Sequence, residues 1–204
     1  ADLREILRDY ARAFFYGEDC EKIVDVIFGM EQSWNGDPAE NWSVENVYRA
    51  LIEMKSDKLM KNWRYVLFLF RASCDKIVRE RRIFELDLID DARTQIRKGN
   101  IELAKEILST DFDEEYKDLR AELFPLAEKL FNLIGMQLDV EHFGGMNVER
   151  GCVLDTIDMP VTDRNYLLNK IKSHPDSDYL AEIFDRNRVE KDEYYFSFAE
   201  HGFE

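Results

Sequence analysis

The chain has 204 residues, enough for one sizeable hydrophobic core, and its 45% hydrophobic and 35% charged residues are typical of a globular protein. A formal net charge of -15 argues against binding to nucleic acid, which needs a cationic face, and against binding to an anionic membrane surface. The sequence has no apolar run near the roughly 18 residues of a membrane-spanning helix and does not open with a signal peptide. We therefore expect a soluble protein, either cytoplasmic or exported as part of a longer protein.

Helical periodicity starts near the N-terminus. Apolar residues at spacings of three and four predict one helix over residues 2–17 and a second over residues 19–29, with Gly29 as its end. A turn region rich in Asn, Gly, Asp and Pro follows over residues 33–42, and Ser43 is the expected N-cap of a third helix.

Two tryptophans, Trp34 and Trp42, bracket this turn region. A flat indole beside amide and carboxylate groups is suited to stacking on a sugar, so both are candidate ligand-binding residues. The alternative is that each indole anchors the turn to the helices, as an amphipathic ring often does. Exposure of both indoles would favour a binding surface, and burial would exclude one.

The longest periodic region runs from about Asp57 to Lys98 and contains neither glycine nor proline. It predicts one long helix or two helices joined at a bend. Acidic residues interrupt its basic run of Arg79, Arg81 and Arg82, which is typical of a solvated helix face rather than of a nucleic-acid site. We therefore expect these arginines to be exposed.

Shorter helices follow this region. We expect them over residues 101–110, over residues 113–138 with a kink at Pro125, and over residues 177–186. Thr162 is the expected N-cap of a further helix that precedes the last of these. The final aromatic-rich stretch fits either a strand or a frayed helix.

The predicted fold class is all-α, an antiparallel helical bundle of about seven or eight helices with one long central helix. Residues 1–138 are expected to form the bundle, residues 139–165 a structured irregular connector, and residues 166–204 the C-terminal helices and tail of the same domain. Long irregular segments in helical domains are uncommon and tend to be functional or disordered. The apolar residues of the connector argue against disorder.

Charged side chains of the connector are the candidate catalytic groups. Two opposed carboxylates can hydrolyse a glycosidic bond, and the sequence offers Glu149 with Asp155 or Asp158 as such a pair. Arg150 and Arg164 are candidates for holding an anionic group beside it. The alternative is that these charges form ion pairs and caps that hold a loop without regular backbone pairing.

His142 is a further candidate ligand-binding residue in the connector, although a histidine at such a position is more often bonded to a loop carbonyl. The acidic residues around it match no calcium-binding loop spacing. The three cysteines form no CxxC pair and no disulfide framework. No metal site and no cofactor are therefore predicted.

The run ERGCVLDTIDMPVTDRNYL, residues 149–167, resembles a segment of pattern ERGxxLDTIDxPLxxRxWL in large multidomain bacterial carbohydrate-processing proteins of the glycoside hydrolase-like type. Val161 and Tyr166 depart from the pattern conservatively. The matching residues are Glu149, Arg150, Gly151, Leu154, Asp155, Thr156, Ile157, Asp158, Pro160, Arg164 and Leu167. In those proteins the segment joins a helical region to neighbouring modules. The resemblance thus implies a helical module of a larger protein that acts on or near glycans.

The sequence supports three functional hypotheses. The first is a helical accessory or scaffold module of a larger bacterial protein in carbohydrate metabolism, whose partners are neighbouring domains of a longer chain and a glycan. Both ends of the chain look like cuts in a longer sequence, which favours this hypothesis. The second is a free-standing helical hydrolase with a carboxylate and arginine site in residues 139–165. The third is an acidic protein-interaction module that uses the surface around Trp34 and Trp42.

Overall fold

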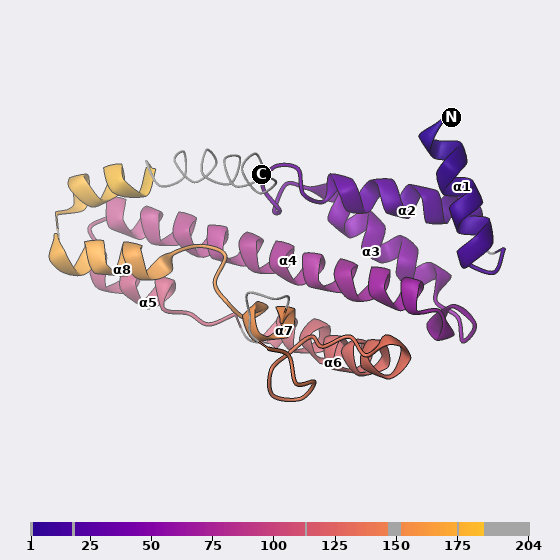
Figure 1. The fold of residues 1–204 in the computed structure, drawn as a ribbon. Helices are drawn as coiled ribbons and strands as arrows, with labels where there is room; N and C mark the ends of the chain where they lie inside the picture. The colour runs from indigo at the N-terminus through magenta and orange to yellow at the C-terminus, as the bar shows by residue number, and fades with distance from the viewer. Residues whose placement is uncertain (1, 18, 113, 147–151, 175, 186–204) are drawn as a thin grey trace. The chain divides into compact units, whose positions relative to one another are not determined.

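The computed structural model describes residues 2–17, 19–112, 114–146, 152–174 and 176–185, and all regular secondary structure within these ranges is helical. In chain order the helices are α1 (Leu3–Phe14), α2 (Cys20–Gln32), α3 (Trp42–Met54), the 3-10 turn η1 (Leu59–Lys61), α4 (Trp63–Arg97), α5 (Ile101–Leu108), α6 (Glu114–Ile134), α7 (Val153–Thr156) and α8 (Arg164–Ser173), and residues 177–185 are also helical (Figure 1). The predicted all-α class with one long helix is confirmed. Within the described ranges, no helix is both long and apolar enough to cross a membrane. The final aromatic-rich stretch lies outside the described residues.

The longest described helix, α4, is continuous over 35 residues. Of the two alternatives for this region, one long helix and two bent ones, the structure has the first. The helix begins after Asn62, whose Oδ1 accepts a hydrogen bond from the backbone N–H of Arg64 at 3.1 Å. It ends before Gly99, which has a positive φ of 79° that favours glycine.

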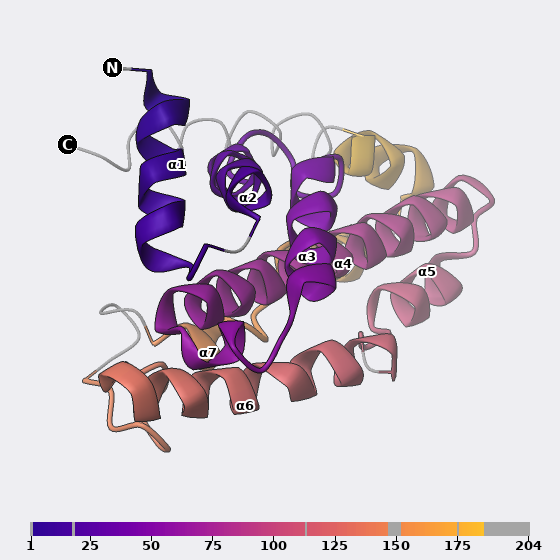
Figure 2. The ribbon, with the colours of Figure 1, turned by 90° about the vertical axis from the view of Figure 1, so that its right-hand side faces the viewer.

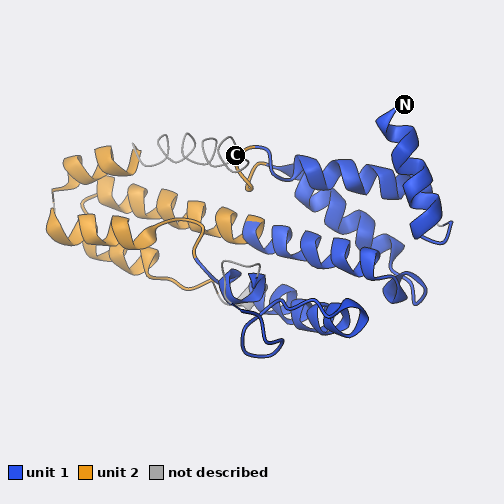
Figure 3. Cartoon of the chain, in the orientation of Figure 1, with its two compact units in different colours: residues 1–35, 41–78, 116–159 blue, residues 36–40, 79–115, 160–204 orange. Residues whose placement is uncertain are grey.

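The chain divides into two compact units, each of which contains part of α4 (Figure 3). Unit 1 comprises residues 1–35, 41–78 and 116–159, and unit 2 comprises residues 36–40, 79–115 and 160–204. The predicted division of the chain at residues 138 and 165 is not tested by this partition and stays a prediction.

Unit 1 contains α1, α2, α3, the first half of α4, and α6. Helix α1 lies beside α2, and α2 lies beside α3 (Figures 1 and 2). Helix α2 approaches α3 closely at Gly29, where an added Cβ atom would lie 2.4 Å from Cγ2 of Val47. The predicted end of this helix at Gly29 is wrong, because the glycine allows this close packing and α2 continues to Gln32. Buried apolar residues of unit 1 include Ala11, Phe15, Ile23, Val24, Leu51, Tyr65, Leu69, Ile77, Leu123 and Leu130.

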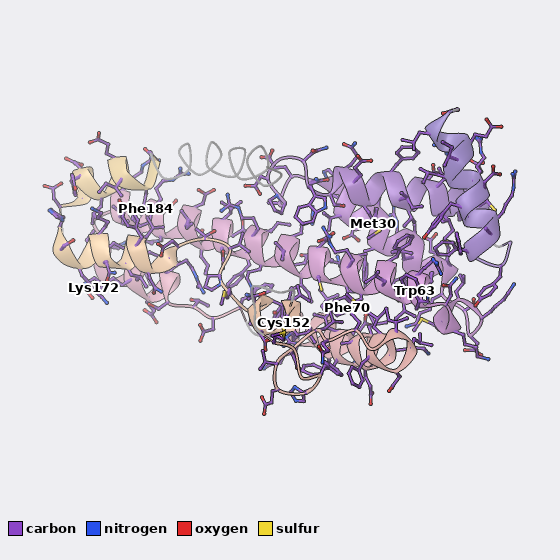
Figure 4. All side chains as sticks on the ribbon, in the orientation of Figure 1. Met30, Trp63, Phe70, Cys152, Lys172 and Phe184 are labelled. Carbon is purple, nitrogen blue, oxygen red and sulfur yellow. The ribbon has the colours of Figure 1, made fainter. Side chains whose placement is uncertain are left out.

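Unit 2 has a hydrophobic core to which the second half of α4, α5, α8 and the helical residues 177–185 all contribute. Its buried members are Ala92, Ile96, Ala104, Leu108, Leu167, Ile171, Leu180 and Phe184, the last of which is labelled in Figure 4. These residues recur at helical spacing, so the sequence periodicity and the observed core agree.

Two N-caps differ from those predicted. Asn41, rather than Ser43, caps α3, because its Oδ1 accepts a hydrogen bond from the backbone N–H of Ser43 at 3.0 Å. Asp163, rather than Thr162, caps α8 by accepting a hydrogen bond from the backbone N–H of Tyr166 at 2.9 Å. In each case a second residue with a capping side chain lies one or two positions from the predicted one.

The basic run of α4 is buried, and the prediction that it forms a solvated face is wrong. Arg79, Arg81 and Arg82 are only 7%, 5% and 3% exposed. The charge of Arg82 is compensated by a carboxylate from a distant part of the chain, Asp37. Asp37 lies 45 residues from Arg82 in the sequence, so the charge pattern around Arg82 could not predict this ion pair.

Candidate functional site

The connector begins with a turn that is organised by the carboxylate of Asp139. This residue is 3% exposed, and its Oδ1 accepts hydrogen bonds from the backbone N–H groups of His142 at 2.7 Å and Phe143 at 2.9 Å. Its Oδ2 lies 2.6 Å from Nδ1 of His142. Burial alone would raise the pKa of Asp139, but these hydrogen bonds outweigh burial and lower the pKa below its ordinary value.

The imidazole of His142 is oriented by Asp139 and remains 54% exposed. Its ring also meets the ring of Phe124 on α6, edge to face, with centroids 5.1 Å apart. An aspartate on Nδ1 orients a histidine in a way that suits proton transfer at Nε2. The same aspartate closes the turn through two backbone bonds, so its geometry serves structure as well as orientation.

The same turn is packed tightly against Cys152, which lies directly before α7 and is labelled in Figure 4. The backbone N–H of Gly145 donates to the carbonyl oxygen of Asp139 at 2.8 Å. A Cβ atom on Gly145 would lie 2.4 Å from Sγ of Cys152 and 2.8 Å from that carbonyl oxygen. Cys152 is therefore a buried packing group of the turn.

Two predicted catalytic carboxylates, Asp155 and Asp158, bind groups of the chain itself. Asp155 accepts a hydrogen bond from the backbone N–H of Val140 at 3.1 Å. Asp158 accepts hydrogen bonds from Nε of Arg120 at 3.1 Å and from the hydroxyl of Tyr116. These contacts tie α7 and the residues after it to α6 and to the start of the connector.

The other half of the predicted catalytic pair, Glu149, and the neighbouring Arg150 lie outside the described residues. The pairing of Glu149 with Asp155 or Asp158 therefore stays a prediction. Among the residues that the structure describes, no three or more His, Cys, Asp or Glu side chains are grouped to hold a metal ion.

The second half of the connector is held by a buried polar network in unit 2. Glu85 on α4 accepts hydrogen bonds from the backbone N–H groups of Val161 at 3.3 Å and Thr162 at 2.5 Å. Arg82 donates from Nη1 to the hydroxyl of Thr162 at 2.9 Å. Nε and Nη2 of the same arginine lie 3.0 and 2.6 Å from the carboxylate of Asp37. The network thus gives partners both to irregular backbone and to buried charge.

Arg164, a candidate for holding an anion, binds backbone carbonyl groups at the end of α5, and its role toward an anion stays a prediction. Its Nη1 donates to the carbonyl oxygens of Leu108 at 3.3 Å and Thr110 at 2.5 Å. A guanidinium at this position satisfies carbonyl groups that a helix end leaves without intrahelical partners.

Trp34 and Trp42 are both exposed in unit 1, with exposed fractions of 66% and 67%. Trp34 follows α2, and Trp42 is the first residue of α3. Nδ2 of Asn41 donates to the carbonyl oxygens of Gln32 and Asn35, both at 2.8 Å. These bonds join the two ends of the intervening turn, so the segments that carry the indoles lie close together. We call Trp34 and Trp42 the indole surface.

One side of the indole surface rests on α4. The guanidinium carbon of Arg71 lies 4.1 Å from the centroid of the Trp34 ring, within the range of a cation–π contact. Nε of Arg71 also donates to Oδ1 of Asp75 at 2.8 Å. Burial raises the pKa of Asp75, and the bond and charge of Arg71 partly offset this effect. Trp34 is thus held by an arginine that is itself fixed by a carboxylate.

A second ion pair lies beside Trp42. Glu45 is three residues after Trp42 on α3, and residues at this spacing share a helix face. Oε2 of Glu45 lies 2.6 Å from Nζ of Lys76 on α4. Arg71 with Asp75 and Lys76 with Glu45 thus form two ion pairs near the indoles.

The sequence indicated candidate residues such as Asp158 and the capping residue Thr162, but it did not indicate which side chains bind them. Thr162 and Arg82 are 80 residues apart, and Tyr116 and Asp158 are 42 residues apart. Separations of this size follow from tertiary folding, so no local spacing could have revealed them.

Comparison with known proteins finds no match. No protein-family model, no curated protein and no solved structure matches the chain. The resemblance of residues 149–167 to carbohydrate-processing proteins therefore stays a prediction.

Replacing Arg82 with Met removes one partner of the buried network and leaves Asp37 and the hydroxyl of Thr162 without it. We expect a loss of about 3 kcal/mol in the free energy of unfolding, since breaking a buried ion pair on one side is strongly destabilising. Urea unfolding followed by circular dichroism measures this loss. The matched control is Arg97→Met on the same helix, where the 56% exposed side chain pairs with Asp185 and less than about 1 kcal/mol should be lost. Equal losses for the two variants would contradict the network.

Replacing Asp139 with Asn tests the organising role of its carboxylate. The folded pKa of Asp139 lies below its unfolded value, so its stabilisation is complete above about pH 4 and is lost as the pH falls through the folded pKa. We expect wild-type stability to decline more steeply with acid than that of Asp139→Asn, as measured by unfolding at a series of pH values. The control Glu141→Gln removes an adjacent exposed charge and should keep the wild-type acid profile. Identical profiles for wild type and Asp139→Asn would refute the assignment.

Proposed function

We propose that this chain is a helical accessory module of a larger bacterial protein that acts on carbohydrate, where it supports a neighbouring domain. The observation that carries the proposal is the use of the charged side chains in the connector. Asp155, Asp158 and Arg164 each bind backbone or side-chain groups of the chain itself. Such groups hold an irregular segment in place, which is the task of a connector between modules.

A hydrolytic role fits the geometry less well. A glycoside hydrolase sets two carboxyl groups on either side of the scissile bond, roughly 5 to 10 Å apart. Asp158 is bound by both Arg120 and Tyr116, and these bonds also hold the connector against α6, which gives the carboxylate a structural task although its side chain is 55% exposed.

Exposed apolar side chains near the end of α6 support a neighbouring domain as partner. Leu133, Ile134 and Val140 are each exposed although they are large and apolar. Apolar side chains that gather on a surface often mark a contact with another domain or protein. The resemblance of residues 149–167 to a segment that joins a helical region to other modules supports the same role.

The natural polypeptide that carries this sequence provides the test. Immunoprecipitation from the source organism, followed by intact-mass measurement, should return a protein much larger than 24.2 kDa with a separate catalytic domain. This chain alone should hydrolyse none of a panel of chromogenic glycosides.

Two results would contradict the proposal. One is a natural polypeptide no larger than this chain. The other is hydrolysis by this chain alone that Asp155→Asn or Asp158→Asn abolishes, since that result establishes the free-standing hydrolase instead.

A further inference from the structure

The indole surface has an unusual degree of exposure for its residue type. At 66% and 67%, Trp34 and Trp42 are more exposed than any tyrosine or phenylalanine in the described part of the chain. Tryptophan carries a large apolar face, and leaving it in water costs free energy that a bound ligand would recover. Two such rings on adjoining segments therefore form a candidate binding site.

Contacts within the chain hold the backbone beside the indoles and the ring of Trp34. Asn41 locks the backbone on both sides of the turn, and Arg71 holds the ring of Trp34 at 4.1 Å. A ligand that binds to fixed rings avoids the entropy of ordering them, which raises its affinity. Trp34 thus has the preorganisation expected of a binding residue.

The charge around the surface disfavours an anionic ligand. Arg71 is paired with Asp75 and Lys76 is paired with Glu45, whereas Glu31, three residues before Trp34 on α2, adds an exposed carboxylate. The exposed carboxylate repels an anionic ligand, whereas hydroxyl groups can bond to the outer atoms of the ion pairs while the pairs remain intact.

The apolar area of the surface is small for a protein interface. On α2, α3, the turn between them and the first half of α4, the large apolar side chains that are strongly exposed are the two indoles and Ile52. A stable protein interface needs a larger buried apolar centre with a polar rim. Two flat apolar rings suit a ligand chain whose units have one apolar face each.

We propose that the indole surface binds neutral pyranose units of a glycan, with Trp34 and Trp42 each stacking on the C–H face of a sugar. The paired side chains of Arg71, Asp75, Glu45 and Lys76 then bond to the ring hydroxyls. This inference rests on the proposed accessory role and names the ligand class of the module. It places the ligand in unit 1 and assigns it no chemical step.

Titration of the ¹⁵N-labelled chain with neutral cello-, xylo-, manno- and malto-oligosaccharides tests the proposal. The chain has three tryptophans, so three indole N–H resonances report directly on ligand binding at each of these side chains. With at least one neutral series, the resonances of Trp34 and Trp42 should shift saturably while that of Trp63 stays in place. Trp34→Ala and Trp42→Ala should each weaken binding by about tenfold or more, since aromatic anchors dominate such contacts. The control Trp63→Phe should leave the affinity unchanged.

Three results would overturn the proposal: no saturable shift with any neutral series at millimolar concentration, preference for acidic oligogalacturonides, or affinity that both alanine variants leave unaltered. A protein partner that protects both indoles, found where no saccharide binds, would assign the surface to a protein interface and also overturn it. The size of the natural polypeptide tests the accessory role separately. If the natural protein is long but binds no saccharide, only the inference about the indole surface is contradicted. If the natural chain is of this size and binds saccharide, only the accessory role is contradicted.

Discussion

The buried ion pair between Arg82 and Asp37, with its extension to Thr162 and Glu85, is the interaction on which the second half of the connector depends. A guanidinium and a carboxylate lose hydration on burial, and their attraction offsets this loss only when the remaining donors and acceptors also find partners. Here the hydroxyl of Thr162 takes a third donor of the arginine, and Glu85 accepts from two backbone N–H groups. Each group of the network supplies a hydrogen bond to another, so removing any one of them costs another group that hydrogen bond.

In the first half of the connector, different residues supply the hydrogen-bond partners that the irregular backbone needs. Irregular backbone has no helix or sheet to take up its N–H groups, and a carboxylate is the strongest side-chain acceptor available. Asp139 accepts from two consecutive residues, and Asp155 accepts from Val140. The high density of charge in the connector, which at first suggests an active site, is explained to a large extent by what its own backbone requires.

Much of the helical framework could be predicted from the sequence, because helical periodicity is a local property. The long helix α4, its end at Gly99 and the core of unit 2 follow from apolar spacing and from residue types that end helices. The role of Gly29 could not be predicted, since close packing against Val47 and helix termination both favour glycine. The burial of the arginines of α4 could not be predicted, because it depends on groups that are distant in the sequence and come close only on folding. For the candidate sites, sequence reasoning found the right residue types but not their partners, and the exposure of Trp34 and Trp42 could be learned only from the fold.

Amide hydrogen exchange at Val161 and Thr162 tests the structural role of the connector most directly. Both N–H groups belong to irregular backbone, and without Glu85 they should exchange at the rate of an unfolded peptide. We expect slow exchange at both amides, comparable with the buried part of α4, and a large acceleration at both in Glu85→Gln. Fast exchange at these two amides in the wild-type chain would contradict this role.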